Sequence, residues 1–440
     1  MGVNNWKKKR IKDLCVRVSD GLHGTPEYSE KSDIAFINGN NLKNGKIEVN
    51  HNTKYVTEEE FIKNYIKLDD NTLLISINGT LGSMAFYNGE KIMLGKSAAY
   101  LNFKTDINRF YFYYFQLSGV QDYFYNVATG STIKNLSLKS IQEFEVPVPD
   151  KKIYNNIVKV LSDLDAKIEV NNKINKELEA MAKTLYDYWF VQFDFPYDFE
   201  KGKPDVNGKP YKSSGGKMVY NEELKREIPE GWEVKELQDI AETGSGSTPL
   251  KSKKEFYENP TVPWINSGEV NEPFIVSASK FISEAGLAGS SAKLFPRGAI
   301  LMAMYGATAG QVSLIDIEAC TNQAICAILP TQERFKYFIK FGLEDLYDYL
   351  VNLSTGSARD NLSQTKIRNL DFLIPSDSLL QEFHKIVNPM MEKILINLKE
   401  NQKLSELRDW LLPMLMNGQV SVGEAEERLS MVAEERGKYN

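Results

Sequence analysis

Two long stretches of the chain carry hydrophobic residues at spacings of three and four, which is the pattern of helices that pair as a coiled coil. The first stretch starts after Pro149 and the second after Pro375. Each continues for about five heptads, which predicts a paired helix and not an isolated amphipathic one. The expected seam positions are Ile153, Ile157, Leu161, Leu164, Ile168, Asn171, Asn175, Leu178, Ala182 and Leu185 in the first stretch, and Leu379, Phe383, Val387, Met390, Ile394, Asn397, Asn401, Leu404, Arg408 and Leu411 in the second.

Two asparagines interrupt the seam of each stretch, at Asn171 and Asn175 and again at Asn397 and Asn401. An asparagine among apolar seam residues costs stability, but it fixes the register and the orientation of the partner helix. We therefore interpret the four asparagines as a register device. The alternative is that they only loosen the surface of a helix.

The segments that precede the two helices repeat each other. Residues 129–137 lie over residues 355–363, a shift of 226 positions without a gap. The same register continues to Pro149 and Pro375 and yields eight identities over 21 positions, where unrelated segments would give about one. The chain is therefore an internal duplication.

Upstream of these blocks the match continues with small insertions, and each copy starts near a tryptophan, Trp6 or Trp232. In both copies a buried apolar run enters a glycine-rich turn, and a second apolar run follows as the expected return strand. These segments are residues 73–82 and 98–103 in the first copy, and residues 300–310 and 324–329 in the second. The predicted fold class is α+β, with two strand-rich domains that are each followed by a long helix. The two helices are expected to pair as an antiparallel coiled coil with pseudo-twofold symmetry.

The change from strand-like to helical spacing sets the predicted boundaries. The middle of the chain is rich in Gly, Pro, Lys and Ser, which is typical of a partly ordered linker. In the second helix, Pro389 is expected to introduce a kink and Pro413 to end the helix. The predicted parts are a first domain at 1–150, its helix at 151–194, the linker at 195–231, a second domain at 232–376, its helix at 377–418 and a mobile tail at 419–440.

Composition narrows the class of protein. Hydrophobic residues make up 42% and charged residues 25% of the chain, and no stretch reaches the ~18 apolar residues of a membrane span. The net charge of −6 argues against a protein that coats nucleic acid non-specifically, so any DNA contact requires local basic patches. Cys15, Cys320 and Cys326 are too scattered for a disulfide framework or a zinc site. We expect buried thiols and, without a signal-peptide core, a cytoplasmic protein.

The usual catalytic constellations are not found in the sequence. None of the three histidines has metal-ligand spacing, and His384 is expected on a helix surface. Residues 89–97 resemble a phosphate-binding loop, but five residues separate the glycines where the motif requires four. Asp150 and Asp165 imitate a nuclease pair, but the helix between them would place them about 20 Å apart, too far to share a magnesium ion. We expect a non-catalytic chain that holds neither a metal nor a cofactor.

Two divergent domains held apart by paired helices would bind two sites that are separated by a fixed distance. From Ile153 to Trp189 the first helix would span 37 residues, or about 55 Å, whereas the major groove of B-DNA recurs every ~34 Å. Two such domains could contact one duplex at separated half-sites. Their divergence predicts an asymmetric target in two parts.

The chain resembles the specificity subunits of Type I restriction-modification systems over nearly its whole length. The first element of the resemblance is the repeated Thr-Gly-Ser-x-x-x-Asn-Leu-Ser…Ile…Pro block at 129–149 and 355–375. The second is the helix ending Ala-Lys-Thr-Leu-Tyr-Asp-Tyr-Trp-Phe at 182–190. The third is the passage from Ser-Ser-Gly-Gly-Lys-Met at 213–218 to Ile-Pro-Glu-Gly-Trp at 228–232. Together these motifs are specific, whereas any one alone would be weak.

The resemblance implies that each domain is a target-recognition domain for one half of a bipartite sequence in double-stranded DNA. The paired helices would act as a spacer and would dock two methyltransferase subunits, through which restriction and translocase subunits join. Catalysis would belong to those partners, with S-adenosylmethionine for adenine methylation and ATP with magnesium for restriction. No membrane partner is implied.

Side-chain chemistry selects the candidate DNA contacts, because amide, hydroxyl and cationic groups contact base edges and phosphates. In the repeated block, Gly130 and Gly356 are expected to form positive-φ turns, and Ser137 and Ser363 to cap short helices. For each lysine, a solvated surface position is an equally good interpretation. The candidates are His23, Thr25, Asn38, Asn40, Asn41, Lys43, Asn78, Thr80, Lys96, Ser97 and Lys134 in the first domain, and Ser247, Thr248, Lys251, Lys253, Lys254, Asn266, Ser267, Tyr305, Thr308, Asn322, Gln323 and Arg359 in the second.

Two other functions remain open on the sequence alone. A self-contained restriction enzyme of the same broad type would need nuclease and methylase motifs in this chain. A protein-binding coiled-coil scaffold without a DNA role is slightly favoured by the acidic net charge. The resemblance favours the specificity subunit over both.

Overall fold

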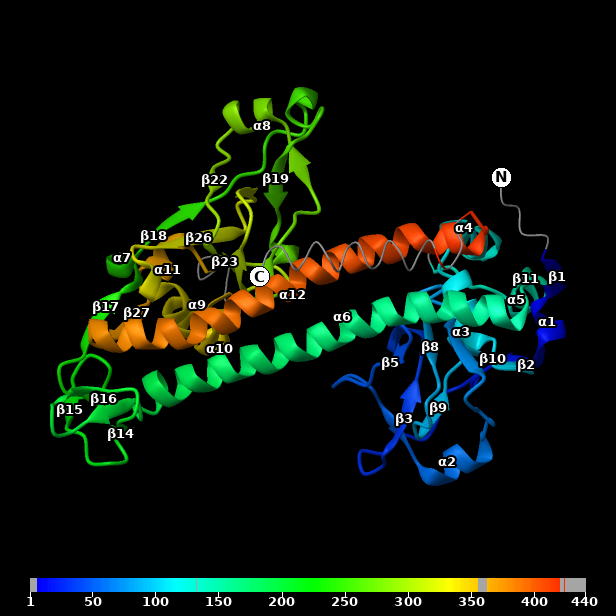
Figure 1. Ribbon diagram of the computed structural model, residues 1–440, viewed down its shortest axis with the longest axis horizontal. Coiled ribbons are helices and arrows are strands. Elements are labelled where there is room, and N and C mark those ends of the chain that lie inside the picture. Colours follow the sequence, from blue (N-terminus) through cyan, green and yellow to red (C-terminus); the bar gives the residue numbers. More distant parts are fainter. Residues whose placement is uncertain (1–5, 132, 355–361, 420–422, 424–440) are drawn as a thin grey trace. The chain divides into compact units, whose positions relative to one another are not determined.

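The computed structural model of the protein describes residues 6–131, 133–354, 362–419 and 423 (Figure 1). The chain divides into two compact units, one formed by residues 1–168 and 403–440 and the other by residues 169–402. Each unit contains one globular domain and one stretch of each long helix. Of the predicted tail at 419–440, only Gln419 and Gly423 lie within the described residues.

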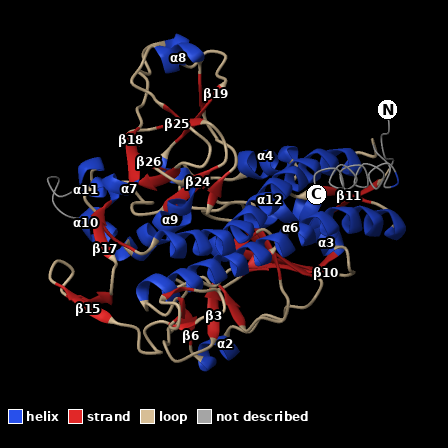
Figure 2. Cartoon of the chain, turned by 60° about the vertical axis from the view of Figure 1, so that its left-hand side comes forward, coloured by secondary structure: helices blue, strands red, loops and turns tan. Residues whose placement is uncertain are grey.

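A four-stranded antiparallel sheet with the order β2-β10-β7-β8 forms the centre of the first domain. A smaller sheet with the order β6-β3-β9, in which β3 runs parallel to β9, lies on the side of the domain away from the helices (Figures 1 and 2). The strands are β1 (Lys7–Arg10), β2 (Cys15–Asp20), β3 (Ile34–Ile37), β4 (Leu42–Lys43), β5 (Lys46–Ile47), β6 (Tyr55–Val56), β7 (Thr72–Ser76), β8 (Met84–Phe86), β9 (Ile92–Leu94), β10 (Ala98–Phe103) and β11 (Glu145–Val148). The helices of this domain are α1 (Ile11–Leu14), α2 (Glu58–Lys63), α3 (Asn108–Tyr114), α4 (Ser118–Val127) and α5 (Leu138–Glu143).

The second domain repeats this arrangement with a five-stranded sheet, β18-β26-β23-β24-β20, and a four-stranded sheet, β21-β19-β25-β22. The strands are β17 (Glu233–Glu236), β18 (Ala241–Ser245), β19 (Val262–Ile265), β20 (Phe274–Ile275), β21 (Phe281–Ile282), β22 (Leu294–Phe295), β23 (Ile300–Ala303), β24 (Val312–Ile315), β25 (Ala319–Thr321), β26 (Ile325–Pro330) and β27 (Asp371–Ile374). The helices are α7 (Leu237–Ile240), α8 (Glu284–Ala288), α9 (Lys336–Asp345), α10 (Tyr347–Ser354) and α11 (Gln364–Arg368). Both β7 and β23 are buried at every position, which explains their uninterrupted apolar runs.

Strand register shows how far the duplication extends into the tertiary structure. In the first copy β1 pairs with β11 through Lys7 and Val148, and in the second copy β17 pairs with β27 through Glu233 and Ile374. Each residue of the second pair lies 226 positions after its counterpart in the first pair. The predicted return strand of the second copy was placed one residue too early. It starts at Ile325.

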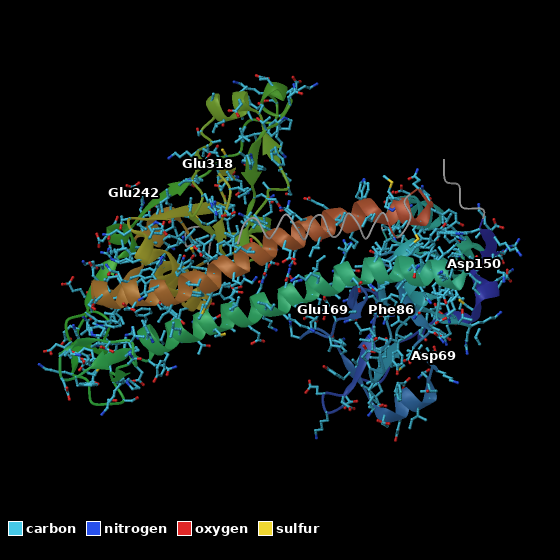
Figure 3. The ribbon with its side chains drawn as sticks, viewed as in Figure 1. Asp69, Phe86, Asp150, Glu169, Glu242 and Glu318 are labelled. Atoms are coloured by element: carbon cyan, nitrogen blue, oxygen red, sulfur yellow. The ribbon has the colours of Figure 1, made fainter. Side chains whose placement is uncertain are left out.

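The two long helices have nearly the predicted bounds. α6 (Lys151–Tyr186) begins directly after Asp150, which Figure 3 labels, and continues through one π-helical turn at Asp187–Val191. α12 (Asp377–Met416) is continuous across Pro389, and the kink expected there stays a prediction. Most seam residues are buried, but Ile153 is 39% exposed and does not belong to the seam.

The seam asparagines bond to each other within the second unit. Asn171 Nδ2 donates to Asn401 Oδ1 at 2.8 Å, and Asn397 Nδ2 donates to Asn175 Oδ1 at 2.8 Å. As the residue number rises along α6, the residue number of the partner on α12 falls, which confirms the antiparallel pairing in this unit. Because all four side chains are buried, a shift of register would separate polar groups from their partners.

Pro413 does not end α12, and that prediction was wrong. A proline removes only its own N–H from the helix ladder, and here the helix continues past it. The end is set by Gly418, whose φ of 66° lies in the left-handed region. Gly418 N donates to Leu415 O at 3.2 Å and Gln419 N donates to Met414 O at 2.9 Å, the two bonds of a Schellman motif.

The predicted linker is folded β structure. It forms a three-stranded sheet, β13-β12-β14, and a two-stranded sheet, β15-β16. The ring of Phe195 lies between Tyr211, at 4.7 Å, and Trp232, at 5.4 Å. This aromatic stacking supplies a small core that the Gly- and Lys-rich composition did not reveal. The strands are β12 (Pro196–Asp198), β13 (Lys203–Pro204), β14 (Lys209–Pro210), β15 (Met218–Asn221) and β16 (Arg226–Pro229).

Polar contacts fix the first domain to its helices. Asp165 of α6 accepts a hydrogen bond from the Tyr113 hydroxyl at 2.7 Å and pairs with Arg408 of α12 at 2.8 Å. Three elements of the first unit therefore meet at one carboxylate. Asp165 therefore joins the first domain to both helices of its unit.

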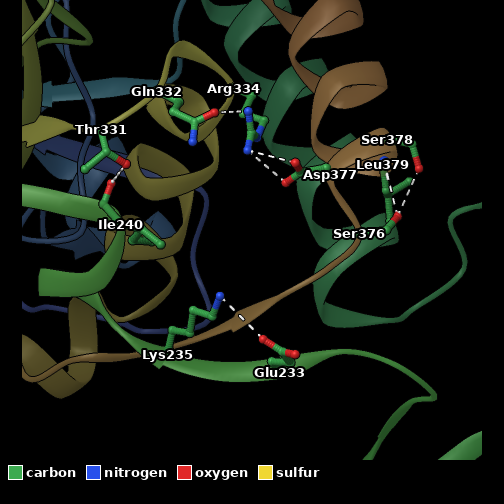
Figure 4. Close-up of polar contacts among 10 residues, drawn as sticks. All are labelled: Glu233, Lys235, Ile240, Thr331, Gln332, Arg334, Ser376, Asp377, Ser378 and Leu379. Carbon is green, nitrogen blue, oxygen red and sulfur yellow. Dashed lines mark hydrogen bonds and ion pairs between the residues drawn. The ribbon is translucent and has the colours of Figure 1, made fainter.

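The second domain has its own anchors. Lys340 of α9 is fully buried, and its ammonium lies 2.6 Å from Glu344 and 3.5 Å from Glu179 of α6. Burial raises the pKa of Glu344. At the start of α12, Arg334 pairs with Asp377 at 2.9 Å (Figure 4). These contacts orient the domain on both helices of its unit.

Three further predictions from the sequence concern His384, the cysteines and membrane-spanning helices. His384 is not a free surface residue, because its ring stacks on Tyr337 at 5.3 Å and burial lowers its pKa. Cys15, Cys320 and Cys326 are buried free thiols, as predicted. Among the described residues, no helix is long and apolar enough to span a membrane.

Candidate nucleic-acid interface

Four loops of the first domain meet at one end of its sheets. They are the segment after β2, the turn after β3, the glycine turn between β7 and β8, and the turn between β9 and β10. The parallel pairing of β3 with β9 and the antiparallel pairing of β10 with β2 and β7 bring these ends together. The topology therefore collects polar loops that are far apart in the sequence.

Short hydrogen bonds join these loops. Ser97 Oγ donates to Asn38 Oδ1 at 2.9 Å and accepts from Gly39 N at 2.9 Å. Thr80 Oγ1 donates to Gly39 O at 2.8 Å. Asn38, Thr80 and Ser97 thus lie together, as candidates for one surface should, but part of their polar capacity is used inside the protein.

The second domain contains the same loop junction. Thr308 Oγ1 donates to Ser267 O at 2.6 Å, which is the counterpart of the contact from Thr80 to Gly39. Thr248 Oγ1 donates to Gln323 Oε1 at 2.6 Å. The scaffold is therefore shared by the two copies, whereas the side chains that it presents differ.

One glycine in each copy permits the close approach of the first loop. A Cβ on Gly21 would lie 2.0 Å from Leu94 O, and a Cβ on Gly246 would lie 2.1 Å from Thr321 Oγ1. The residues that follow these glycines donate backbone hydrogen bonds to the same strands, at 2.8 Å and 2.9 Å. Neither glycine was singled out from the sequence, because only the tertiary structure shows what each one touches.

Several candidates are committed to internal contacts. Asn41 is buried, with its amide bonded to Asn38 N, Glu48 O and Thr53 Oγ1, so we remove it from the set of DNA-facing residues. Asn266 Nδ2 donates to Glu269 Oε1 at 2.7 Å and its Oδ1 caps a short turn. The sequence alone does not distinguish asparagines whose amides bond within their own loop from asparagines whose amides are free to contact DNA.

Other candidates have exposed or partly exposed polar groups. Lys43 pairs with Glu48 and His23 with Asp20, and Lys134 lies 4.9 Å from the centre of the Tyr125 ring. The exposed candidates are Thr25, Asn40, Thr80, Lys96, Lys251, Lys253, Lys254, Tyr305 and Gln323, whereas Asn78, Ser97, Ser247, Thr248, Ser267, Thr308 and Asn322 are half-buried. Arg359 and Gly356 lie outside the described residues.

The structural roles assigned to the repeated blocks are confirmed where the structure describes them. Gly130 has a φ of 106°. Ser137 caps α5 through Ser140 N, and Ser363 caps α11 through Lys366 N.

A basic strand was missed by sequence reasoning. Lys7, Lys8, Lys9 and Arg10 of β1 are all exposed, although Arg10 pairs with Glu143 at 2.9 Å. The equivalent strand β17 reads Glu-Val-Lys-Glu, so the formal charge changes from +4 to −1 between the copies. A run of basic residues is visible in the sequence, and its position relative to the repeat would have shown this asymmetry.

Among the residues that the structure describes, no group of three or more His, Cys, Asp and Glu side chains could hold a metal ion. Burial raises the pKa of the Cys15 and Cys326 thiols to about 12. Both thiols are therefore protonated and poorly nucleophilic at neutral pH. The polar loop junctions are the best candidate site of each domain.

Among known protein families, one family model matches two separate parts of the chain. The family model described as Type I restriction modification DNA specificity domain matches residues 4–180 and again residues 229–406. The Type I restriction enzyme MjaIX specificity subunit of Methanocaldococcus jannaschii is 28% identical over 430 residues, covering 96% of this chain and 94% of that protein. The HindI specificity subunit of Haemophilus influenzae is 26% identical, covering 95% and 100%.

A solved structure shares the fold. The S subunit of a Type I restriction-modification system from M. genitalium superposes with a TM-score of 0.55 at 18% identity, covering 94% of this chain and 96% of that chain. The duplicated domains and the two long helices are thus a known architecture.

Proposed function

Because the chain belongs to the family of Type I restriction modification DNA specificity domains and is a specificity subunit of that type, we propose that its two domains recognise the two halves of one bipartite DNA target. The observation that supports this proposal is the repeated loop junction. Both copies have the same threonine-to-carbonyl bond at the same place. Around that bond, Asn40 and Lys96 of the first copy give way to different side chains in the second. A shared scaffold with different exposed groups suits two different half-sites.

The helices provide the second part of the proposal. Buried asparagine pairs hold α6 and α12 in one register within the second unit, which is what a spacer of constant length requires. We assign to the same helices the docking of two methyltransferase subunits, and through them of restriction and translocase subunits. The chain itself would be non-catalytic and would act in the cytoplasm. S-adenosylmethionine, ATP and magnesium would be bound by the partners.

The test is a map of methylated adenine in the genome of cells that express the chain with its methyltransferase partners. We expect methylation at a motif in two parts, separated by a fixed number of unspecified base pairs, and its loss when this chain is deleted. Replacing residues 6–131 by the same domain of a relative with another target should change one half of the motif only. Methylation that persists without the chain would contradict the proposal and favour a scaffold without a DNA role.

A further inference from the structure

A pocket beside the loop junction of the first domain is lined mainly by amide side chains. Its volume is about 190 Å³, and its lining consists of five asparagines, two aromatic rings, Thr53 and Lys54. The asparagines come from two segments, the turn after β3 and the loop between β5 and β6. Such a concentration of one polar group in one pocket indicates recognition of a ligand that offers both donors and acceptors.

One of these asparagines holds the two walls together. Asn41 is 4% exposed, and its Oδ1 accepts from Asn38 N at 3.0 Å. Its Nδ2 donates to Glu48 O at 2.8 Å and to Thr53 Oγ1 at 3.1 Å. Because these bonds tie the first wall to the second, the pocket keeps its shape without a ligand.

Two other asparagines keep their amides available. Asn40 and Asn52 are exposed, and within the described part of the chain neither side-chain amide forms a hydrogen bond. The turn that carries Asn52 is itself held, because Asn52 N donates to Asn50 Oδ1 at 2.9 Å and Asn50 N donates to Thr53 Oγ1 at 2.9 Å. The backbone that presents the free amide is therefore fixed before any ligand binds.

The rest of the lining suits a nucleotide. Tyr28 and Phe36 pack edge to face with ring centres 6.0 Å apart. Lys54 Nζ lies 4.5 Å from the centre of the Tyr28 ring. The rings offer apolar contact to a base or a thymine methyl group, and the lysine offers a cation to a neighbouring phosphate.

An amide side chain presents one donor and one acceptor side by side. Adenine presents the complementary pair in the major groove, an N6 amino donor and an N7 acceptor, whereas guanine presents two acceptors and cytosine a donor. We propose that Asn40 and Asn52 select adenine in the half-site of the first domain, with Lys54 on the adjoining phosphate. This assignment rests on the proposed function, because it names a base that is recognised in one of the two half-sites, at a position other than the adenine that is methylated.

The second domain lacks the same arrangement. Its corresponding turn begins at Asn266, whose amide is bonded to Glu269 and to Gly268 N. The Asn-rich segment 38–52 is replaced there by a sequence with few amides. The selection of adenine by this pocket therefore applies to one half of the target.

The experiment uses the full chain assembled with its methyltransferase partners and a plasmid library with randomised sites. Methylated sites are sequenced for the wild type and for Asn40→Asp and Asn52→Asp, which preserve shape but replace the amide donor by a second acceptor. We expect methylation of sites with adenine at one position to fall roughly 10- to 100-fold. Methylation of sites with cytosine at that position should rise, because the N4 amino group of cytosine donates a hydrogen bond to a carboxylate. Asn44→Asp introduces the same charge on the same segment outside the pocket lining, and it should leave the motif unchanged.

The outcomes separate the two proposals. If the wild-type motif has no second half, the proposed function itself fails. If the motif is bipartite but both pocket variants keep its base preference, only the assignment of the pocket fails. If a variant methylates no site, the same pool is selected by DNA binding to the assembled complex, where relaxed preference at one position supports the assignment and unchanged preference overturns it.

Discussion

Replacing Asn401 by leucine tests whether the asparagines of the seam hold the helices in register. Asn401 accepts from Asn171 Nδ2 and donates to Asn172 Oδ1 at 2.7 Å. Asn171 is fully buried, so its Nδ2 would lose its bond to Asn401 away from solvent, whereas the exposed Asn172 can bond to water. The loss of a hydrogen-bond acceptor by a buried amide costs about 1–3 kcal/mol. The gain from a buried leucine is about 1.5–3 kcal/mol but is offset by overpacking of about 1–3 kcal/mol. We expect Asn401→Leu to destabilise the seam by about 2 kcal/mol.

The double variant Asn171→Leu/Asn401→Leu removes both partners and should recover most of that loss, since it contains no buried amide at position 171 that has lost its acceptor. The pair Asn175 and Asn397 should behave differently. In the described structure Asn175 Nδ2 is buried without a partner, so the wild type already bears that cost. Asn175→Leu/Asn397→Leu is therefore expected to be more stable than the first double variant.

The assay is urea unfolding followed by far-ultraviolet circular dichroism, with hydrogen exchange of the α6 and α12 amides to locate the change in stability. The single and double variants of one pair form a double-mutant cycle. If Asn401→Leu is as stable as the wild type, or if the double variant is as unstable as the single one, the lost bond between Asn171 and Asn401 does not determine the stability of the seam. The polar seam would then have no role in fixing the register.

Three further predictions concern separate sites. Burial lowers the pKa of His384, which stacks on Tyr337. The unfolded state therefore binds more protons as the pH falls through the ordinary histidine pKa, near 6.5, and stability is lost below it. His384→Phe should flatten this part of a pH series of thermal unfolding, and an unchanged slope would contradict the argument. Gly418→Ala should cost about 1 kcal/mol, because a side chain is strained at its φ of 66°. The control Gly119→Ala, where a Cβ meets nothing within 4 Å, should not destabilise the protein, because Gly119 lies in α4 and alanine is the better helix former. Equal losses for both variants would reject the capping role of Gly418. Lys96→Glu should weaken DNA binding by the assembled complex and lower the slope of log K against log salt by about one; an unchanged slope in a salt titration would remove Lys96 from the interface.

The sequence determined the elements whose cause is local. The heptad spacing established α6 and α12 and most of their seam, because side chains three and four positions apart share one face of a helix whatever surrounds them. The repeat established two similar domains, and Ser137, Ser363 and Gly130 were predicted in their roles because caps and positive-φ turns depend on neighbouring residues. The end of α12 at Gly418 was equally local, but the weight placed on Pro413 obscured it.

The tertiary structure decided everything that depends on contacts between distant segments. Asn41 and Asn40 are adjacent and chemically identical, yet the first is buried and bonded across two loops whereas the second is exposed. The linker was judged by its composition, and only the stacking of Phe195 between Tyr211 and Trp232 shows that it is folded. Burial and hydrogen bonding are properties of a location in space, and a residue's type and neighbours do not determine them. The sequence alone was therefore sufficient for the helices and the family, and only the fold separated structural amides from those free to contact DNA.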